Sequence, residues 1–109
     1  MSVLEEDGKG RGENPAEAHR DWCVYLLTCA DGTLYCGVTS DVERRLAMHN
    51  GRIAGGAKYT RGRRPVTLTA CAGGLTRGEA LRLEARVKKK PRGEKLAALL
   101  AGGGRDSER

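Results

Sequence analysis

The chain of 109 residues contains no phenylalanine and only one tryptophan, so aromatic side chains can fill little of a core. Leucine, valine and alanine must fill it instead, and the length suits one small domain. No apolar run approaches the roughly 20 residues that cross a bilayer, which excludes a transmembrane helix. The N-terminal stretch also lacks the apolar segment of a secretory signal, so we expect a cytoplasmic protein with no membrane partner.

Cysteine pairs with metal-binding spacing are missing as well. The four cysteines, Cys23, Cys29, Cys36 and Cys71, form no C-x-x-C pair, which argues against a structural zinc site. A disulfide framework is not expected in a cytoplasmic chain. We therefore interpret all four as small, reduced residues of the core.

Acidic residues are absent from a long central stretch. Residues 1–21 carry a net charge of −3 and residues 22–109 a net charge of +9, and seven bases with no acid lie between Arg44 and Arg64. Such a stretch suits a polyanionic partner such as nucleic acid. A merely solvated basic surface explains the same pattern, so charge alone does not decide between the two.

The pattern of elements predicts one folded domain between two tails. Residues 1–20 and 102–109 lack apolar periodicity and are expected to be disordered, which leaves a domain of residues 21–101. Strands are predicted at 22–28, 34–39 and 66–70, and a Gly-rich basic loop at 51–65. Helices are predicted at 41–49, at about 77–89, and after Pro91. The order ββαβαα indicates an α+β fold, a small three-stranded antiparallel sheet flanked by helices.

Two sequence signals predict where the helices begin. Ser40 with Glu43, and Thr76 with Glu79, have the spacing of a capping box, in which each side chain bonds the other residue's backbone amide.

The first two predicted strands are joined at Asp31-Gly32. A two-residue turn would place Tyr25 and Tyr35 on opposite faces, whereas a loop with one more residue places them on one face. The second register also gathers the apolar residues on the other face. We therefore predict a three-residue loop with Gly32 at positive φ, or an equivalent bulge, with Ala30 opposite Leu34.

Glu84 is a carboxylate on the apolar side of a predicted helix. Ala80, Leu83 and Val87 form a stripe at helical spacing, and Glu84 falls beside it. A buried carboxylate needs an ionic partner or a metal. A salt bridge to an arginine and a divalent cation are both open at this point.

Other polar residues recur at spacings that suit phosphate chemistry. Arg45 and His49 share one helical face, where an arginine can grip a phosphate and a histidine can transfer a proton. An exposed helical face is the alternative. Tyr59 stands in the basic loop, where it could bond a phosphate or stack on a base.

The segment VYLLTCADGTLYCGVTSDVERRLAMHN resembles the N-terminal half of GIY-YIG nuclease domains. The two signature tripeptides appear as Cys23-Val24-Tyr25 and Tyr35-Cys36-Gly37. Downstream, AKYTRGRRPV and ALRLEARVKK are similar to the small stand-alone UPF0213 subfamily. The resemblance covers residues 21–100, and the ordered set of Tyr, Tyr-x-Gly, Arg, His and Glu is its specific part.

The resemblance implies a metal-dependent endonuclease that hydrolyses phosphodiester bonds in nucleic acid, DNA being favoured over RNA. By position, Tyr25 and Tyr35 would orient and activate the attacking water, and Arg45 would stabilise charge on the phosphoryl oxygens. Glu84 would hold one Mg²⁺ or Mn²⁺ ion, and His49 matches a position used as base or proton relay.

Further residues follow from the same resemblance. Gly37 would allow close backbone approach, and Asn50 is assigned a structural role. The expected nucleic-acid contacts are Lys58, Tyr59, Arg61, Arg63 and Arg64. Val38 stands where some repair members carry a lysine, and we expect no attached recognition domain, so a partner protein could supply specificity. The alternative is a non-catalytic nucleic-acid-binding module with the same fold.

Overall fold

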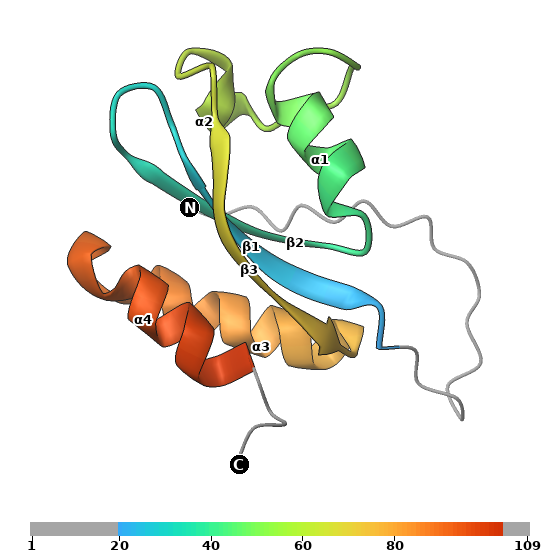
Figure 1. Ribbon diagram of the computed structural model, residues 1–109, viewed down its shortest axis with the longest axis vertical. Coiled ribbons are helices and arrows are strands. Elements are labelled where there is room, and N and C mark those ends of the chain that lie inside the picture. Colours follow the sequence, from blue (N-terminus) through green and yellow to red (C-terminus); the bar gives the residue numbers. More distant parts are fainter. Residues whose placement is uncertain (1–19, 104–109) are drawn as a thin grey trace.

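The computed structural model describes residues 20–103, which contain one three-stranded sheet. Figure 1 shows this sheet between two groups of helices. The elements in chain order are β1 (Trp22–Thr28), β2 (Leu34–Thr39), α1 (Val42–His49), α2 (Lys58–Arg61), β3 (Thr67–Leu75), α3 (Arg77–Lys88) and α4 (Arg92–Gly103). The predicted α+β fold is confirmed, with the short helix α2 added inside the stretch predicted to be a loop. No helix among the described residues is long and apolar enough to cross a membrane.

The sheet has the strand order β2-β1-β3, and both pairings are antiparallel. The central strand β1 is consequently buried on both faces. One face packs against α3 and α4 and the other faces α1 and α2 (Figure 1). The core on the α3 side contains Val24, Leu26, Cys36, Val38, Ala72, Leu75, Ala80, Leu83, Val87 and Leu99. The smaller cluster on the opposite face contains Tyr25, Leu27, Cys29 and Val66.

The hairpin between β1 and β2 places both signature tyrosines on the face toward α1, as predicted. Tyr25 pairs with Gly37, and Leu27 pairs with Tyr35. The predicted pairing is wrong by two residues, because Leu34 lies opposite Thr28 and not Ala30, and Cys29 N–H donates to the Thr33 carbonyl at 2.8 Å. The three loop residues are therefore 30–32. Gly32, at φ +86°, is the last of them, where such a loop requires positive φ.

The start of α1 differs from the prediction. Its N-cap is Asp41, whose carboxylate accepts from the Arg44 amide at 3.0 Å, so the predicted Ser40–Glu43 capping box is wrong. Thr39 Oγ1 accepts from the Asp41 amide at 3.0 Å, and this turn moves the cap one residue along. At α3, the predicted capping box of Thr76 and Glu79 is confirmed.

Several predicted boundaries also move. β3 continues to Leu75, beyond the predicted residue 70, because the strand stays paired with β1 through register shifts and a positive φ at Gly74. α4 continues to Gly103, two residues past the predicted domain end. The predicted tails, 1–20 and 102–109, lie outside the described residues except at 20, 102 and 103.

Three of the four cysteines are buried and all four are free thiols. The prediction of a core position is wrong for Cys71, which is exposed. Cys71 lies on the edge strand β3 opposite Tyr25, where the helices on that side of the sheet leave it uncovered.

Candidate functional site

Two tyrosines and one histidine meet on the sheet face toward α1. The ring centroids of Tyr25 and Tyr35 are 6.4 Å apart, and the His49 ring is 5.8 Å from Tyr25 and 5.1 Å from Tyr35. Tyr59 of α2 adds a third phenol, 5.7 Å from the Tyr35 ring. Tyr25 is 1% exposed, whereas Tyr35 is only half-buried. The pair thus offers one phenol sealed beneath the surface and one that water can reach.

His49 is fully buried, and its hydrogen bonds indicate its tautomer. The Ala57 amide donates to Nδ1 at 3.3 Å, so Nδ1 acts as an acceptor. Nε2, 2.9 Å from the Tyr25 hydroxyl, then carries the hydrogen and donates it to Tyr25. Thr60 Oγ1 lies 3.1 Å from Nδ1 and donates to the Ala57 carbonyl at 2.9 Å. The imidazole is therefore held as a neutral donor to the buried phenol.

The charge state of His49 follows from its surroundings. Burial first, and then the positive charges of Arg45 and Arg64, lower its pKa from 6.5 to about 4. At neutral pH the ring is uncharged, and it is a poor acceptor of a further proton. Its role in this site is to donate from Nε2.

This depressed pKa predicts acid sensitivity. The free energy of unfolding should fall by roughly 2–3 kcal/mol as the pH drops from 7 to 4, because the unfolded chain takes up a proton on His49 that the folded chain refuses. The stability that depends on an uncharged His49 is fully present above pH 6.5, the pKa in the unfolded chain, and is lost as the pH falls toward 4. Urea unfolding at a series of pH values measures it. His49→Gln should flatten the profile, and parallel profiles for the two proteins would contradict the assignment.

Gly37 lies directly across from Tyr25 in the sheet. A Cβ at this position would overlap the Tyr25 hydroxyl and lie 2.6 Å from its Cζ. The space that the missing side chain leaves is thus filled by the buried tyrosine ring. Gly37 was expected to allow close backbone approach, and the group that approaches is Tyr25.

A hydrogen bond and a close backbone contact hold the loop after α1 against the end of that helix. Arg45 is 4% exposed, and its Nη1 donates to the Gly55 carbonyl at 2.9 Å. A Cβ on Gly56 would lie 3.0 Å from His49 Cα and overlap the Met48 carbonyl, so only glycine fits there. This close contact brings the Ala57 amide against His49.

Asn50 and Arg64 close the same helix end. The Asn50 side chain both accepts from the Val66 amide at 2.7 Å and donates to the Val66 carbonyl at 2.9 Å. Arg64 donates from Nε to the His49 carbonyl at 2.7 Å. Arg64 therefore positions the histidine through its backbone carbonyl, and Asn50 ties the next residue of the chain to Val66.

The four basic residues among the five expected nucleic-acid contacts divide into two groups. Arg63 is held by Asp31 at 3.0 Å, donates to the Tyr59 carbonyl, and lies 4.1 Å from the centroid of the Tyr59 ring. Arg64 caps α1, as described above. Lys58 and Arg61 are exposed, and within residues 20–103 their side chains make no hydrogen bond or ion pair. These two are the basic side chains available to a ligand.

Glu84 points into the interface between α3 and the sheet and is 6% exposed, as its helical position predicted. Its ionic partner is Lys88, one turn along α3, with Nζ 3.1 Å from Oε2. Lys88 Nζ is also 5.8 Å from the centroid of the Tyr35 ring. Glu84 thus belongs to the layer opposite the histidine, and Lys88 connects it to the tyrosines.

Glu84 fits a metal ligand in its chemistry. Among the described residues it is the one buried carboxylate, and its Oε2 accepts no hydrogen bond of good geometry from them. The described residues contain no cluster of three metal-binding side chains. Mg²⁺ is suited to a single carboxylate, because it keeps several waters and takes further oxygens from a substrate phosphate.

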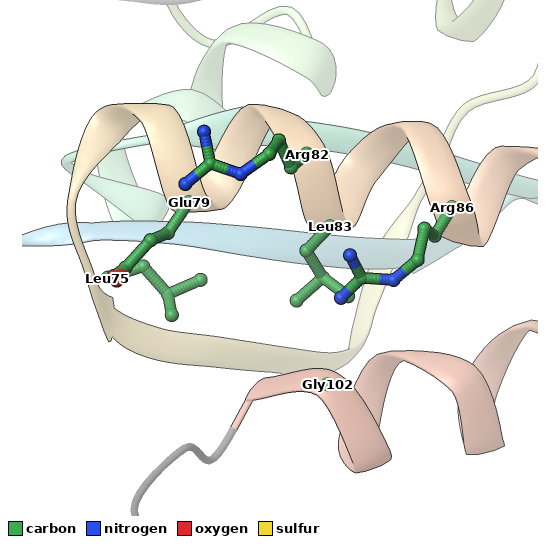
Figure 2. Close-up of a pocket in the computed structure, with 6 residues that line it drawn as sticks. All are labelled: Leu75, Glu79, Arg82, Leu83, Arg86 and Gly102. Carbon is green, nitrogen blue, oxygen red and sulfur yellow. The ribbon is translucent and has the colours of Figure 1, made fainter.

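A cavity of about 210 Å³ lies elsewhere, between α3 and α4 (Figure 2). Its lining residues are Leu75, Glu79, Arg82, Leu83, Arg86 and Gly102. None of them is a predicted site residue, so this cavity is separate from the tyrosine cluster.

Sequence reasoning did not identify three residues that shape the site. Thr60 and Ala57 bond His49, and Lys88 pairs with Glu84. For Lys88 a signal was present, since Glu and Lys at i and i+4 on one helix commonly pair. For Thr60 and Ala57 the contact depends on how the loop folds back on α1.

Comparisons with known proteins agree on one family. The GIY-YIG catalytic domain family matches residues 21–96. A UPF0213 protein of Nitratidesulfovibrio vulgaris is 55% identical over 89 residues, 81% of this chain and 78% of that protein. A UPF0213 protein of Halobacterium salinarum is 50% identical over 74 residues, 68% of this chain and 94% of that protein. The solution NMR structure of an E. faecalis protein matches with a TM-score of 0.53 and 32% identity, over 84% of this chain and 97% of that one.

Proposed function

The chain belongs to the GIY-YIG catalytic domain family, and from this premise we propose that it is a divalent-metal-dependent endonuclease that cuts nucleic acid, DNA being favoured. The observation that carries the proposal is the cluster of Tyr25, Tyr35 and His49 on one face of the sheet, beside a basic segment. Two phenols, a neutral histidine and one buried carboxylate suit phosphodiester hydrolysis better than they suit simple binding.

In the proposed reaction the two tyrosines have different roles. Tyr35 is the phenol that water can reach, so we assign it contact with the attacking water. Tyr25 is buried and accepts a hydrogen bond from His49, which fixes the direction of its hydroxyl beside the Tyr35 ring. His49 acts as a fixed donor, since its pKa of about 4 leaves it neutral.

Negative charge on the phosphoryl group would be stabilised from two sides. Arg45 is almost fully buried, so we assign it stabilisation of the phosphoryl charge through its field and through its hold on Gly55. Glu84 would hold the divalent cation, which supplies Lewis-acid stabilisation of the leaving oxygen when it is bound.

The direct test is incubation of the protein with single-stranded, duplex and branched DNA and with RNA, with Mg²⁺, with Mn²⁺ and with EDTA. Cleavage that needs a divalent cation is expected for at least one DNA substrate. If every substrate is bound but none is cut with either metal, the protein is instead a non-catalytic nucleic-acid-binding module.

The second candidate, binding without catalysis, has its own support in the exposed side chains of Lys58 and Arg61. Both proposals need these residues, so they do not separate catalysis from binding. A partner protein that supplies specificity is compatible with either.

The basic residues make a prediction about binding. Affinity for duplex DNA should fall with salt, with a slope of about 0.9 in log K per log salt for each neutralised phosphate. Lys58→Ala and Arg61→Ala should each remove one phosphate contact and so reduce this slope by about 0.9. Neither substitution should change the free energy of unfolding. Fluorescence anisotropy at several salt concentrations measures it.

Arg63→Ala provides the contrast. It breaks the ion pair with Asp31 and the contact with Tyr59, so it should lower the melting temperature as well as the affinity. If Lys58→Ala and Arg61→Ala bind like the wild type at every salt concentration, these residues are not in the interface.

A further inference from the structure

Lys88 of α3 lies between the buried carboxylate and the tyrosine cluster. Its Nζ is 3.1 Å from Glu84 Oε2 and 5.8 Å from the centroid of the Tyr35 ring. The Lys88 side chain is 24% exposed and that of Glu84 is 8% exposed. One ammonium group therefore lies at ion-pair distance from Glu84 and within cation–π range of the Tyr35 ring.

The contact between Lys88 and Glu84 is incomplete. The two groups lie within ion-pair distance, yet Glu84 Oε2 is buried and accepts no well-aligned hydrogen bond from the described residues. The ammonium thus offsets the negative charge without satisfying the oxygen. A small hard cation would supply charge and a direct bond at the same oxygen.

A second lysine, Lys95, also contacts the end of α3. Lys95 is occupied elsewhere, since its Nζ donates to the carbonyls of Val87 and Lys88 at the end of α3. Lys88 is thus the cation that pairs with Glu84.

We propose that Lys88 is a displaceable counter-ion of Glu84, which neutralises the carboxylate in the metal-free protein and yields it to a divalent cation. The inference rests on the proposed metal site and concerns which group neutralises Glu84 when no metal is bound. Two positive charges repel each other at one carboxylate, so metal binding and the ion pair must weaken each other equally. Once displaced, the ammonium remains beside Tyr35, where it can meet a substrate phosphate.

The first test is titration of the full chain with Mn²⁺ in the absence of nucleic acid, with free Mn²⁺ followed by electron paramagnetic resonance. Lys88→Met should bind Mn²⁺ at least about threefold more tightly than Lys89→Met. Lys89 is exposed and adjacent, so the control removes the same charge without touching Glu84. Equal or weaker binding by Lys88→Met, or no binding by either the wild type or Lys88→Met, would overturn the proposal.

The second test is made first on the wild type, so its main result does not depend on how a variant folds. Limited acetylation of the wild type, read by mass spectrometry, should modify Lys88 at least about twofold more when Mn²⁺ is bound, with Lys89 unchanged. The rise should vanish in Glu84→Gln. Unchanged Lys88 acetylation with Mn²⁺ bound would refute displacement. Neither measurement uses nucleic acid, so a failure to detect cleavage counts against the proposed function alone.

Discussion

Replacing Glu84 with glutamine is expected to lower divalent-dependent cleavage at least about a hundredfold while the protein stays folded. Glutamine keeps the shape of the side chain but removes the negative charge that would hold the cation. Glu84 is the one buried carboxylate among the described residues, so no neighbour can replace it. Cleavage rates at saturating Mg²⁺ measure the loss, and circular dichroism checks the fold.

A matched control makes this loss interpretable. Glu43→Gln makes the same chemical change on the exposed surface of α1, and it should leave the cleavage rate within about twofold of the wild type. If Glu84→Gln remained folded and cut as fast as Glu43→Gln, Glu84 would have no part in the reaction.

Substitution of Gly37 by alanine should destabilise the protein by about 2 kcal/mol or more and abolish the tyrosine cluster. The new Cβ would overlap the Tyr25 hydroxyl and lie 2.6 Å from Cζ. The ring cannot move aside easily, because it is 1% exposed and bonded to His49. Urea unfolding measures the loss of stability, and cleavage should fall with it even at temperatures where the variant is folded.

Two further variants separate this clash from a general cost of losing glycine. Gly93→Ala adds a methyl group where no atom lies within 4 Å, on the helix α4, and it should be neutral or slightly stabilising. In a Tyr25→Ala background the ring is gone, so Gly37→Ala should cost much less. An equal cost in both backgrounds would show that Tyr25 is not the obstacle.

Patterns within single elements predicted much of the fold and part of the site. The apolar stripe of Ala80, Leu83 and Val87 correctly placed Glu84 in the interior. The alternation of apolar residues along the first two strands correctly placed Tyr25 and Tyr35 on one face. Both predictions succeed because side-chain direction in a helix or strand depends on spacing along the chain.

Predictions that depended on one position were less secure. The helix α1 was expected to be capped by Ser40, but Thr39 bonds the Asp41 amide and the cap moves to Asp41. The hairpin loop was displaced by one residue, because Gly32 takes the last loop position. Several polar residues nearby can cap or turn the chain, and their competition is decided by the backbone that surrounds them.

The sequence by itself determined the class of fold, the shared face of the tyrosines and the inward direction of Glu84, since these follow from periodicity in short segments. Only the tertiary structure decided which distant groups meet. The Ala57 amide orients His49, the Tyr25 ring occupies the space above Gly37, and Lys88 lies over the Tyr35 ring. These contacts depend on the strand order β2-β1-β3 and on a loop folding back onto α1. Packing between segments sets both, and no local pattern encodes it.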